Sequence, residues 1–591
     1  MSQFKVLQAA TTLSEVALLL GVKPGMLSFQ LYKKPKLTLY SKFEIPKRLG
    51  GTREIWAPEK DLKLLQHRLV DLLQNCIDEI NAAKPEHAKE TDKHLGIAHG
   101  FKRKRSIMSN ARAHKTRRYV FNVDLHDFFG SINFGRIRGF LIKDKNFSLS
   151  PKVATVLAQI ACHENKLPQG SPCSPVISNL IGHTLDVHLV KLAASSGCTY
   201  TRYADDLTFS TNKQEFPPQV AVRALDLDHK WMAGKELTRL ITKSGFSLNE
   251  KKTRMQYRDS RQEVTGLSVN LKINSRKDYR YLVRAMVDNL IRTGAFEHVQ
   301  KIKDTNGSST VVKTPGKSNE LGGMLAFIDL VDQYNVAMYK GESPLLPACI
   351  SRDKLHRQFL LFDRFYAAQL PVILCEGDTD NVYLSHAIHQ LVAAYPNLAN
   401  KDAAGNVKLN VRLHKYSNKV TSRILKLHGG TGDLGHFIAE YHKQLTTKFK
   451  APAGQHPVIM VIDNDSGREA VGAAVKKITK VGIAGTEPFV HITGNLYVVL
   501  TPLTPPTKES YIEQCFDIAT LATPHHGKHF SPSNKIDPAV HYGKVVFAHE
   551  VVRPNASKID FNGFKPLLDR VQAVIEDHAK KVHVAGANAT A

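Results

Sequence analysis

The stretch CTYTRYADDLTFS, residues 198–210, alternates polar and apolar residues on each side of the acidic pair Asp205–Asp206. Alternation of this kind is typical of two β-strands, so the stretch predicts a hairpin with two adjacent carboxylates at its tip. Turns favour aspartate because its side chain bonds the local backbone, and a lone acidic pair therefore also has a purely structural interpretation. The flanking sequence decides between the two.

A third acid follows another β-rich run. RRYVFNVDLHDFF (117–129) delivers Asp124 at the end of a predicted strand. Nucleotidyl transfer to a sugar hydroxyl uses two Mg²⁺ ions roughly 3.5–4 Å apart, and Mg²⁺ prefers carboxylate oxygens while keeping several waters. We predict Asp124 and Asp205 as metal ligands and Asp206 as a third acid at or beside the metals, with Mn²⁺ as an alternative ion.

Three more segments carry parts suited to the same chemistry. LPQGSPCSPVISNL (167–180) is a loop fixed by proline and glycine before an apolar helix. IPKRLGGTREIWAPEKDLKLLQ (45–66) places cations suited to a triphosphate around a Gly-Gly turn, namely Lys47, Arg48 and Arg53. GFSLNEKKTR (245–254) adds Lys251 and Lys252.

Together these five motifs, in this order over residues 43–270, resemble the fingers and palm of a reverse transcriptase. The resemblance implies that Phe129 lies beneath the incoming sugar and excludes a ribose 2′-OH, although a plain core phenylalanine is equally open. It implies that Gln169 and Arg53 contact the nucleotide. One of Lys251 and Lys252 would protonate the leaving pyrophosphate, unless it is a solvated charge.

Two short elements resemble the retron branch of that family. FKRKRSIMSNARAHKTRR (101–118) has eight Lys or Arg and no acid, a pattern usually found on a solvated face. Within it, NARAH (110–114) resembles the retron NAxxH element, and VTG (264–266) resembles the second retron signature. The resemblance implies RNA-binding roles for four residues: Arg105, Asn110, His114 and Lys115.

Retron enzymes use a structured noncoding RNA from their own locus as template. The resemblance therefore implies dNTPs as substrates, cDNA started from the 2′-OH of an internal guanosine, and a branched RNA–DNA product (msDNA). A host RNase H would trim the template. The helical segment 271–340 would be a thumb that grips nucleic acid through phosphates, so binding should depend on salt.

A second set of acids follows two short apolar runs. PVILC (371–375) leads into EGDTD, HPVIMVI (456–462) leads into DNDSG, and a helical pattern follows each. This predicts βαβ units on a parallel sheet, whose strand C-terminal ends line one crevice. Glu376, Asp463 and Asp465 should meet there. Solvated acids in the connecting loops are the alternative.

This pattern resembles a Toprim domain of the type found in OLD-like nucleases. The resemblance implies that Glu376 is a general acid/base or ligand and that Asp463 and Asp465 hold Mg²⁺. Weaker candidates are Asp433 in a glycine-rich loop, Glu513, and Lys544, which could stabilise phosphorane charge. No tyrosine nucleophile is evident, which favours hydrolysis over strand passage.

Composition is consistent with this interpretation. The 591 residues are 42% hydrophobic, as in globular proteins, and the net charge of +27 favours a polyanionic partner. No apolar run reaches the ~18 residues of a membrane span, no signal peptide is evident, and seven cysteines are scattered without a CxxC pair. We expect a cytoplasmic protein without membrane contact.

The predicted fold class is multidomain α/β and α+β, with a right-hand-like reverse transcriptase (fingers, palm, helical thumb) before a Rossmann-like parallel-sheet Toprim domain. The expected parts are a helical segment (1–42), fingers and palm (43–270), thumb (271–340), linker and connecting helix (341–370), Toprim domain (371–556), and C-terminal helix and tail (557–591).

The leading hypothesis is a retron reverse transcriptase fused to a Toprim nuclease effector, for which the resemblance implies a role in antiphage defence. One alternative is an RNA- or msDNA-binding antitoxin scaffold with Toprim as the only essential enzyme. Another gives the Toprim domain primase-like activity. An intron-encoded maturase is disfavoured because no zinc motif is evident. The nuclease target and a homo-oligomeric state stay open.

Overall fold

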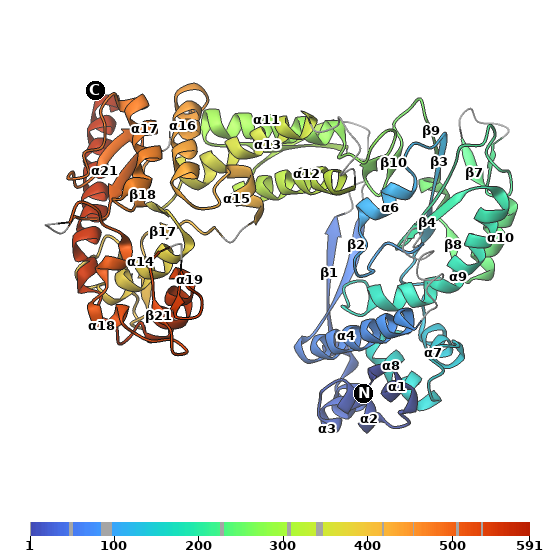
Figure 1. Cartoon of the computed structure of the whole chain (residues 1–591). Helices are drawn as coiled ribbons and strands as arrows, with labels where there is room; N and C mark the ends of the chain where they lie inside the picture. The colour runs from blue at the N-terminus through green and yellow to red at the C-terminus, as the bar shows by residue number, and fades with distance from the viewer. Residues whose placement is uncertain are drawn as a thin grey trace. The chain divides into compact units, whose positions relative to one another are not determined.

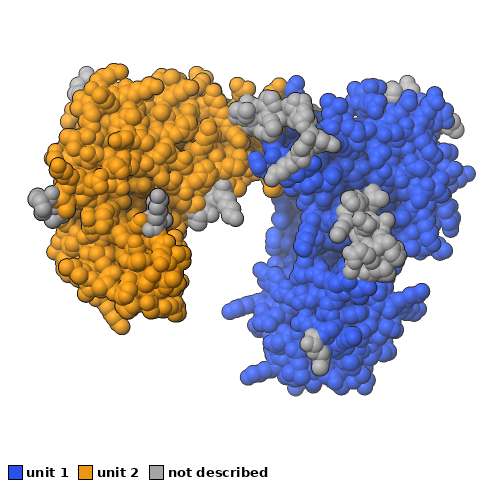
Figure 2. Space-filling view, in the orientation of Figure 1, with its two compact units in different colours: residues 1–277, 331–338 blue, residues 278–330, 339–591 orange. Residues whose placement is uncertain are grey.

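The computed structural model describes residues 2–46, 51–83, 97–224, 230–303, 309–338, 347–416, 419–452, 454–503, 507–533 and 536–590. Contacts divide the chain into two compact units (Figure 2). The first contains residues 1–277 and 331–338, and the second contains residues 278–330 and 339–591.

The first unit begins with three short helices, α1 (Gln3–Ala9), α2 (Leu13–Leu19) and α3 (Pro24–Ser28). A capping box between Thr12 and Glu15 starts α2, because each side chain bonds the other residue's backbone N–H. The antiparallel hairpin of β1 (Tyr40–Pro46) and β2 (Thr52–Pro58) follows, and then the long helix α4 (Lys60–Ala82) (Figure 1).

The central sheet of this unit is antiparallel, with strand order β4-β5-β3-β8. Its strands are β3 (Tyr119–His126), β4 (Thr199–Tyr203), β5 (Asp206–Thr211) and β8 (Ser247–Leu248), and β9 (Arg254–Tyr257) pairs with the other side of β3. The 198–210 stretch therefore forms the hairpin that its alternation predicts.

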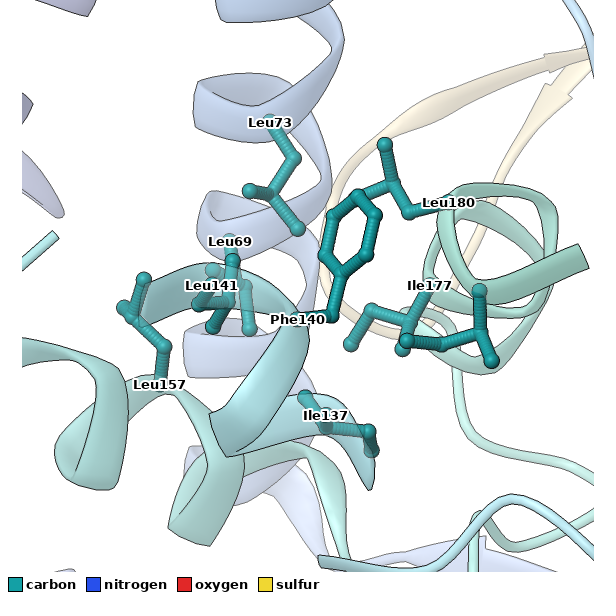
Figure 3. Close-up of a pocket in the computed structure, with 9 residues that line it drawn as sticks. Leu69, Leu73, Ile137, Phe140, Leu141, Leu157, Ile177 and Leu180 are labelled. Carbon is teal, nitrogen blue, oxygen red and sulfur yellow. The ribbon is translucent and has the colours of Figure 1, made fainter. Parts of the chain in front are cut away.

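Helices α4, α7 (Phe134–Lys143), α8 (Pro151–Ala161) and α9 (Ser174–Ser196) pack on one another in the same unit. Phe140 lies among leucine and isoleucine side chains of all four helices (Figure 3). The cavity there is about 10 Å³, room for no more than one water, and its lining is entirely apolar. It is a packing gap and not a ligand site.

The second unit contains a five-stranded sheet in the order β17-β14-β18-β20-β19. Its strands are β14 (Val372–Cys375), β17 (Arg412–Leu413), β18 (Val458–Ile462), β19 (Val490–Thr493) and β20 (Leu496–Leu500). The first four in the order are parallel, and β19 is an antiparallel edge. The parallel sheet predicted from the two apolar runs is thus confirmed.

Alternate residues of these strands enter two separate cores. Leu374 and Met460 belong to a core that includes α16 (Thr431–Thr447) and α17 (Glu469–Thr479). Cys375 and Val461 belong to a core that includes α14 (Asp378–Gln390) and α21 (Lys565–Thr590) (Figure 1). A sheet covered on both faces requires strands that are apolar throughout, which explains the continuous apolar runs.

Helices before the sheet share its first core. α11 (Lys277–Thr293), α12 (Ser318–Met338) and α13 (Pro347–Leu361) contribute buried residues such as Val287, Leu325 and Phe359 to it. The sequence predicts a linker at 341–370, whereas the contacts divide the chain at residue 277 because these helices pack with the C-terminal sheet.

The described residues between α11 and α12 include two strands. They form an antiparallel hairpin of β12 (Glu297–Lys303) and β13 (Ser309–Pro315) within the predicted helical thumb. β-Branched residues such as Val299 and Val311 favour this conformation. Across the described parts of the chain, we find no helix with the length and apolar character that a membrane crossing requires.

Candidate active sites

Three carboxylates meet at one end of the first unit's sheet. The antiparallel register of β3 and β5 sets Asp124 opposite Asp206. Asp205 lies in the turn between β4 and β5, where Ala204 takes a left-handed φ of 56° and the Asp205 carbonyl accepts the Leu125 N–H at 3.0 Å. The structure thus brings together the three acids that the sequence singled out.

The acids repel one another. Desolvation and then the charges of Asp205 and Asp124 raise the pKa of Asp206 to about 7, although part of its side chain faces solvent. Desolvation and then Asp124 also raise the pKa of Asp205. A divalent cation would relieve this repulsion, and carboxylate oxygens are the donors that Mg²⁺ prefers.

The side chains do not form a complete cage by themselves. Within the described ranges, no group of three or more His, Cys, Asp or Glu residues is arranged to hold a metal ion alone. Mg²⁺ normally keeps several waters and takes substrate phosphates as ligands, so a partial set of carboxylates fits it.

Lys252 is the cation beside this cluster. Its Nζ lies 2.8 Å from Asp124 Oδ2, and Asn249 Nδ2 donates to Asp124 Oδ1 at 3.0 Å. Desolvation lowers the pKa of Lys252, but the three aspartates outweigh it and raise the pKa above its usual value. Of the two lysines left open by the sequence, Lys252 is the one that contacts a catalytic candidate.

The other predicted nucleotide contacts lie on neighbouring elements. The Trp56 N–H donates to the Gln169 carbonyl at 2.7 Å, which joins the 167–180 loop to β2, the strand of Arg53. Gly170 has a φ of 116°, and a Cβ there would lie 2.6 Å from Trp56 O, so only glycine permits this approach. The positive charge of Arg53 lowers the pKa of Asp205, although desolvation and Asp124 raise it by more.

Phe129 is linked to the acidic hairpin through a chain of aromatic contacts. It is half-buried, with ring centroids 5.4 Å from Phe128 and 6.3 Å from Phe101. Phe101 in turn lies 6.5 Å from Tyr203 of the acidic hairpin. Lys47 and Arg48 are outside the described residues.

Asn110 and His114 are fully buried, so their expected contact with RNA remains a prediction. His114 bonds Ser210 Oγ through Nδ1 and Thr201 Oγ1 through Nε2, both at 2.7 Å, and the Thr201 hydroxyl donates to Asn110 Oδ1 at 2.6 Å. Desolvation lowers the pKa of His114 to about 3, so the ring is neutral. These residues join α6 (Ile107–Ala113) to the strands that carry the acidic pair.

The second retron-like motif touches the same helix. Thr265 and Gly266 form the turn between β10 (Glu263–Val264) and β11 (Leu267–Ser268), and both have positive φ. The Thr265 hydroxyl donates to the Ile107 carbonyl at 3.2 Å. Arg105 and Lys115 are half-buried, and RNA contact remains a prediction for them.

Arg202 is a functional candidate that the sequence analysis missed. It is fully buried and forms two hydrogen bonds with Asp186 of α9, at 2.8 and 2.7 Å. Its third nitrogen donates to the Ala204 carbonyl at 3.3 Å, directly before Asp205. A buried arginine needs a carboxylate partner, but its identity depends on the tertiary fold.

The second acidic cluster lies at the C-terminal ends of β14 and β18, which are parallel neighbours. Glu376 directly follows β14, and Asp463 and Asp465 follow β18. Backbone N–H groups orient two of these acids, because Ile512 donates to Asp463 at 2.9 Å and Gly467 donates to Asp465 at 2.8 Å.

Two further acids join this cluster. Desolvation, then Asp380 and Glu513, raise the pKa of Asp463 to about 8. The pKa of Asp380 rises to about 6, mainly by desolvation, while its carboxylate accepts the Gly377 N–H. Desolvation and then Asp465 raise the pKa of Glu376. These hard oxygen donors fit Mg²⁺ as well as those of the first cluster do.

Lys544 and Glu513 also belong here, although both were only weak candidates in the sequence. Lys544 Nζ lies 3.1 Å from the fully buried Glu513 Oε2. Among the described residues, Glu513 Oε1 has no hydrogen-bond partner, and so it remains available to a ligand. Asp433 instead accepts the backbone N–H of His428 at 2.7 Å, while Gly430 of the same loop donates to the Glu376 carbonyl.

Comparisons with known proteins concern mainly the first acidic cluster. Residues 45–306 match the family model described as reverse transcriptase (RNA-dependent DNA polymerase). The retron Mx65 reverse transcriptase of Myxococcus xanthus is 34% identical over 48% of this chain and 64% of its own length. The retron Ec86 reverse transcriptase of Escherichia coli is 30% identical over 42% of this chain and 69% of its own length.

Among solved structures, a Candida albicans telomerase in complex with a fragment of telomeric RNA has a TM-score of 0.29 and 10% identity. The match covers 55% of this chain and 59% of the telomerase. A similarity this weak carries no argument about function.

Proposed function

Because the chain belongs to the retron reverse transcriptase family, we propose that its N-terminal part is an RNA-directed DNA polymerase. It copies a structured noncoding RNA, its cognate partner, with dNTPs into a branched RNA–DNA product. The observation that carries this proposal is the register that sets Asp124 opposite Asp206 beside Asp205.

The residues of the site have separate roles. Asp124, Asp205 and Asp206 would hold Mg²⁺, which would supply activation of the attacking hydroxyl and charge neutralisation at the leaving pyrophosphate. Lys252, held on Asp124 at 2.8 Å, donates a proton to the pyrophosphate oxygen as it leaves.

Further residues position the substrate. Arg53 binds the triphosphate. Gln169 contacts the same nucleotide, because the backbone of its loop is hydrogen-bonded to β2, the strand that carries Arg53. Phe129 lies under the sugar and selects deoxynucleotides. Arg105 and Lys115 bind phosphates of the RNA, and a host RNase H trims the template.

Primer extension tests this function. The full chain with its cognate RNA, Mg²⁺ and dNTPs should give cDNA covalently joined to RNA, and the Asp205→Asn variant should give none. The alternative of an RNA-binding antitoxin scaffold predicts an RNA complex without any synthesis in the unaltered protein.

We further propose that the C-terminal unit is a Mg²⁺-dependent Toprim nuclease. Support comes from the acids at the ends of two parallel strands together with the Lys544–Glu513 pair. Glu376 would act as general acid/base, Asp463 and Asp465 would hold the metal, and Lys544 would stabilise charge on the phosphorane. Primase-like activity is the alternative, and synthesis of RNA primers from NTPs would reveal it.

The two activities fit one antiphage system. In this proposal the branched product restrains the nuclease until infection disturbs it. Expression without the noncoding RNA should then be toxic, and Asp463→Asn should remove the toxicity. Equal toxicity of the variant and the unaltered protein would exclude the nuclease as the effector.

A further inference from the structure

A cavity of about 410 Å³ lies within the second unit, apart from the residues of either acidic cluster. Helices α11, α12 and α13 line it, with Lys448 at the end of α16. Its volume is in the range of small-molecule sites, about 300–1,000 Å³. Unlike the packing gap around Phe140, it is large enough for a ligand.

The lining is strongly cationic. Arg and Lys contribute five side chains to it: Arg280, Arg284, Arg352, Lys354 and Lys448. The two acids of the lining, Asp329 and Asp353, both form ion pairs with Arg423. Arg423 offsets the charge of only one of these two acids, but five cations against two acids still leave the lining with a net positive charge. The cavity therefore favours an anion with more than one negative charge.

Part of the lining is apolar. Leu325, Ile328 and Leu355 give it an apolar surface, next to His356. The His356 side chain is only 6% exposed, and its Nδ1 has no hydrogen-bond partner among the described residues. Leaving a buried polar atom unpaired is unfavourable, and a bound polar group would pair with it.

We propose that this cavity binds a nucleotide, with its phosphates on the Arg and Lys side chains and its base or sugar against Leu325, Ile328 and His356. A phosphate alone would use the cations but leave the apolar surface and the imidazole empty. A purely apolar ligand would not use the positive charge that Arg284, Lys354 and Lys448 bring to the lining. A nucleotide satisfies all three features.

The same chemistry is found in a free nucleoside triphosphate and in the terminal nucleotide of a nucleic-acid strand. The cavity volume admits one nucleotide, so a strand would insert only its end. Two probes separate these sources, namely ATP and a 5′-phosphorylated hexanucleotide.

Binding of both probes to the full chain would be measured by calorimetry in EDTA, where uncompensated carboxylates in the acidic clusters repel phosphates. We expect Arg284→Glu combined with Lys448→Glu to weaken binding at least tenfold. The matched control, Arg292→Glu with Lys443→Glu, changes exposed residues of the same two helices outside the cavity and should stay within twofold. Lys354→Glu provides a second, independent variant, and circular dichroism verifies that each folds.

Photolabelling with 8-azido-ATP locates the site. The label should fall in the peptides of α11 and α13. Cavity-dependent binding of ATP identifies a free nucleotide, and cavity-dependent binding of the hexanucleotide alone identifies a strand end. Equal affinities of the cavity and control variants for both probes, or label confined to residues 117–180, would overturn the proposal.

Discussion

Lys252 Nζ lies 2.8 Å from Asp124 Oδ2, on the carboxylate that faces Asp206 across β3 and β5. One cation thus contacts the same acid that we assign to the metals. This contact ties the predicted proton donor to the acidic cluster and separates it from its neighbour Lys251.

Lys252→Gln should slow single-nucleotide incorporation by about 10²-fold or more, because a positioned general acid contributes typically 10²–10⁴-fold. Lys251→Gln is the matched control and should leave the rate within about twofold. Rapid-quench measurement of the chemical step distinguishes them. Equal effects of the two substitutions would reduce both lysines to general electrostatic roles.

Protonation of Asp206 should couple stability to pH in the absence of divalent ions. The pKa of Asp206 is raised to about 7 in the folded chain, so the folded state binds its proton more tightly than the unfolded state does. The contribution of this group to the free energy of unfolding should therefore fall as pH rises from about 4 to 7.

Urea unfolding in EDTA at several pH values between 5 and 8 measures this dependence. Asp206→Asn should make the curve shallower, and Mg²⁺ should stabilise the unaltered protein more at pH 8 than at pH 6. An unchanged curve in the variant would show that Asp206 does not titrate in this range.

Breaking the buried Arg202–Asp186 pair should destabilise the first unit. Arg202→Leu leaves a buried carboxylate uncompensated, which costs about 3–5 kcal/mol. The double variant with Asp186→Leu should regain much of that stability but not polymerase activity, because the hydrogen bond to Ala204 beside Asp205 is still missing. Full activity in a stable double variant would exclude Arg202 as a positioning residue.

His114→Ala tests whether the NAxxH element acts inside the protein. Loss of its two buried hydrogen bonds should lower the free energy of unfolding by about 1–3 kcal/mol or more. RNA affinity measured well below the unfolding temperature should change less than it does in Lys115→Ala. Loss of RNA affinity at unchanged stability would restore the direct-contact interpretation.

Asp463→Asn should separate metal binding from folding in the second unit. The pKa of Asp463 is raised to about 8 in the folded chain, so without a cation the contribution of this group to stability is lost as pH rises toward and through that value. The variant should lose Mg²⁺-dependent cleavage and yet unfold at a higher temperature than the unaltered chain in EDTA at pH 9. Glu576→Gln, on the exposed face of α21, should change neither property.

The local elements of both clusters could be predicted, the first from the alternation on each side of Asp205–Asp206 and the second from short apolar runs that end in acidic residues. The pairing of Asp124 with Asp206 and the approach of Glu376 to Asp463 follow from those patterns. The Arg202–Asp186 pair could not be predicted, since its members lie on a strand and a helix whose packing no periodicity specifies.

Two further differences between the sequence-based expectation and the structure also arise from tertiary packing that local patterns do not specify. Asn110 and His114 are polar within a basic run, which suggests a surface, but their partners Thr201 and Ser210 lie 91 and 96 residues away along the chain. The apolar face of α11 predicts that one side of the helix is buried, but not which hydrophobic core it packs into. Only the tertiary structure joins it to the C-terminal sheet.

The central claim is that two separate acidic clusters each hold a divalent cation. Fe²⁺ substituted for Mg²⁺ generates hydroxyl radicals that cut the backbone near each bound ion. We predict cuts near residues 124 and 205 and near residues 376 and 463, with Asp205→Asn removing only the first set and Asp463→Asn only the second. Cuts elsewhere, or loss of both sets in either variant, would contradict the account.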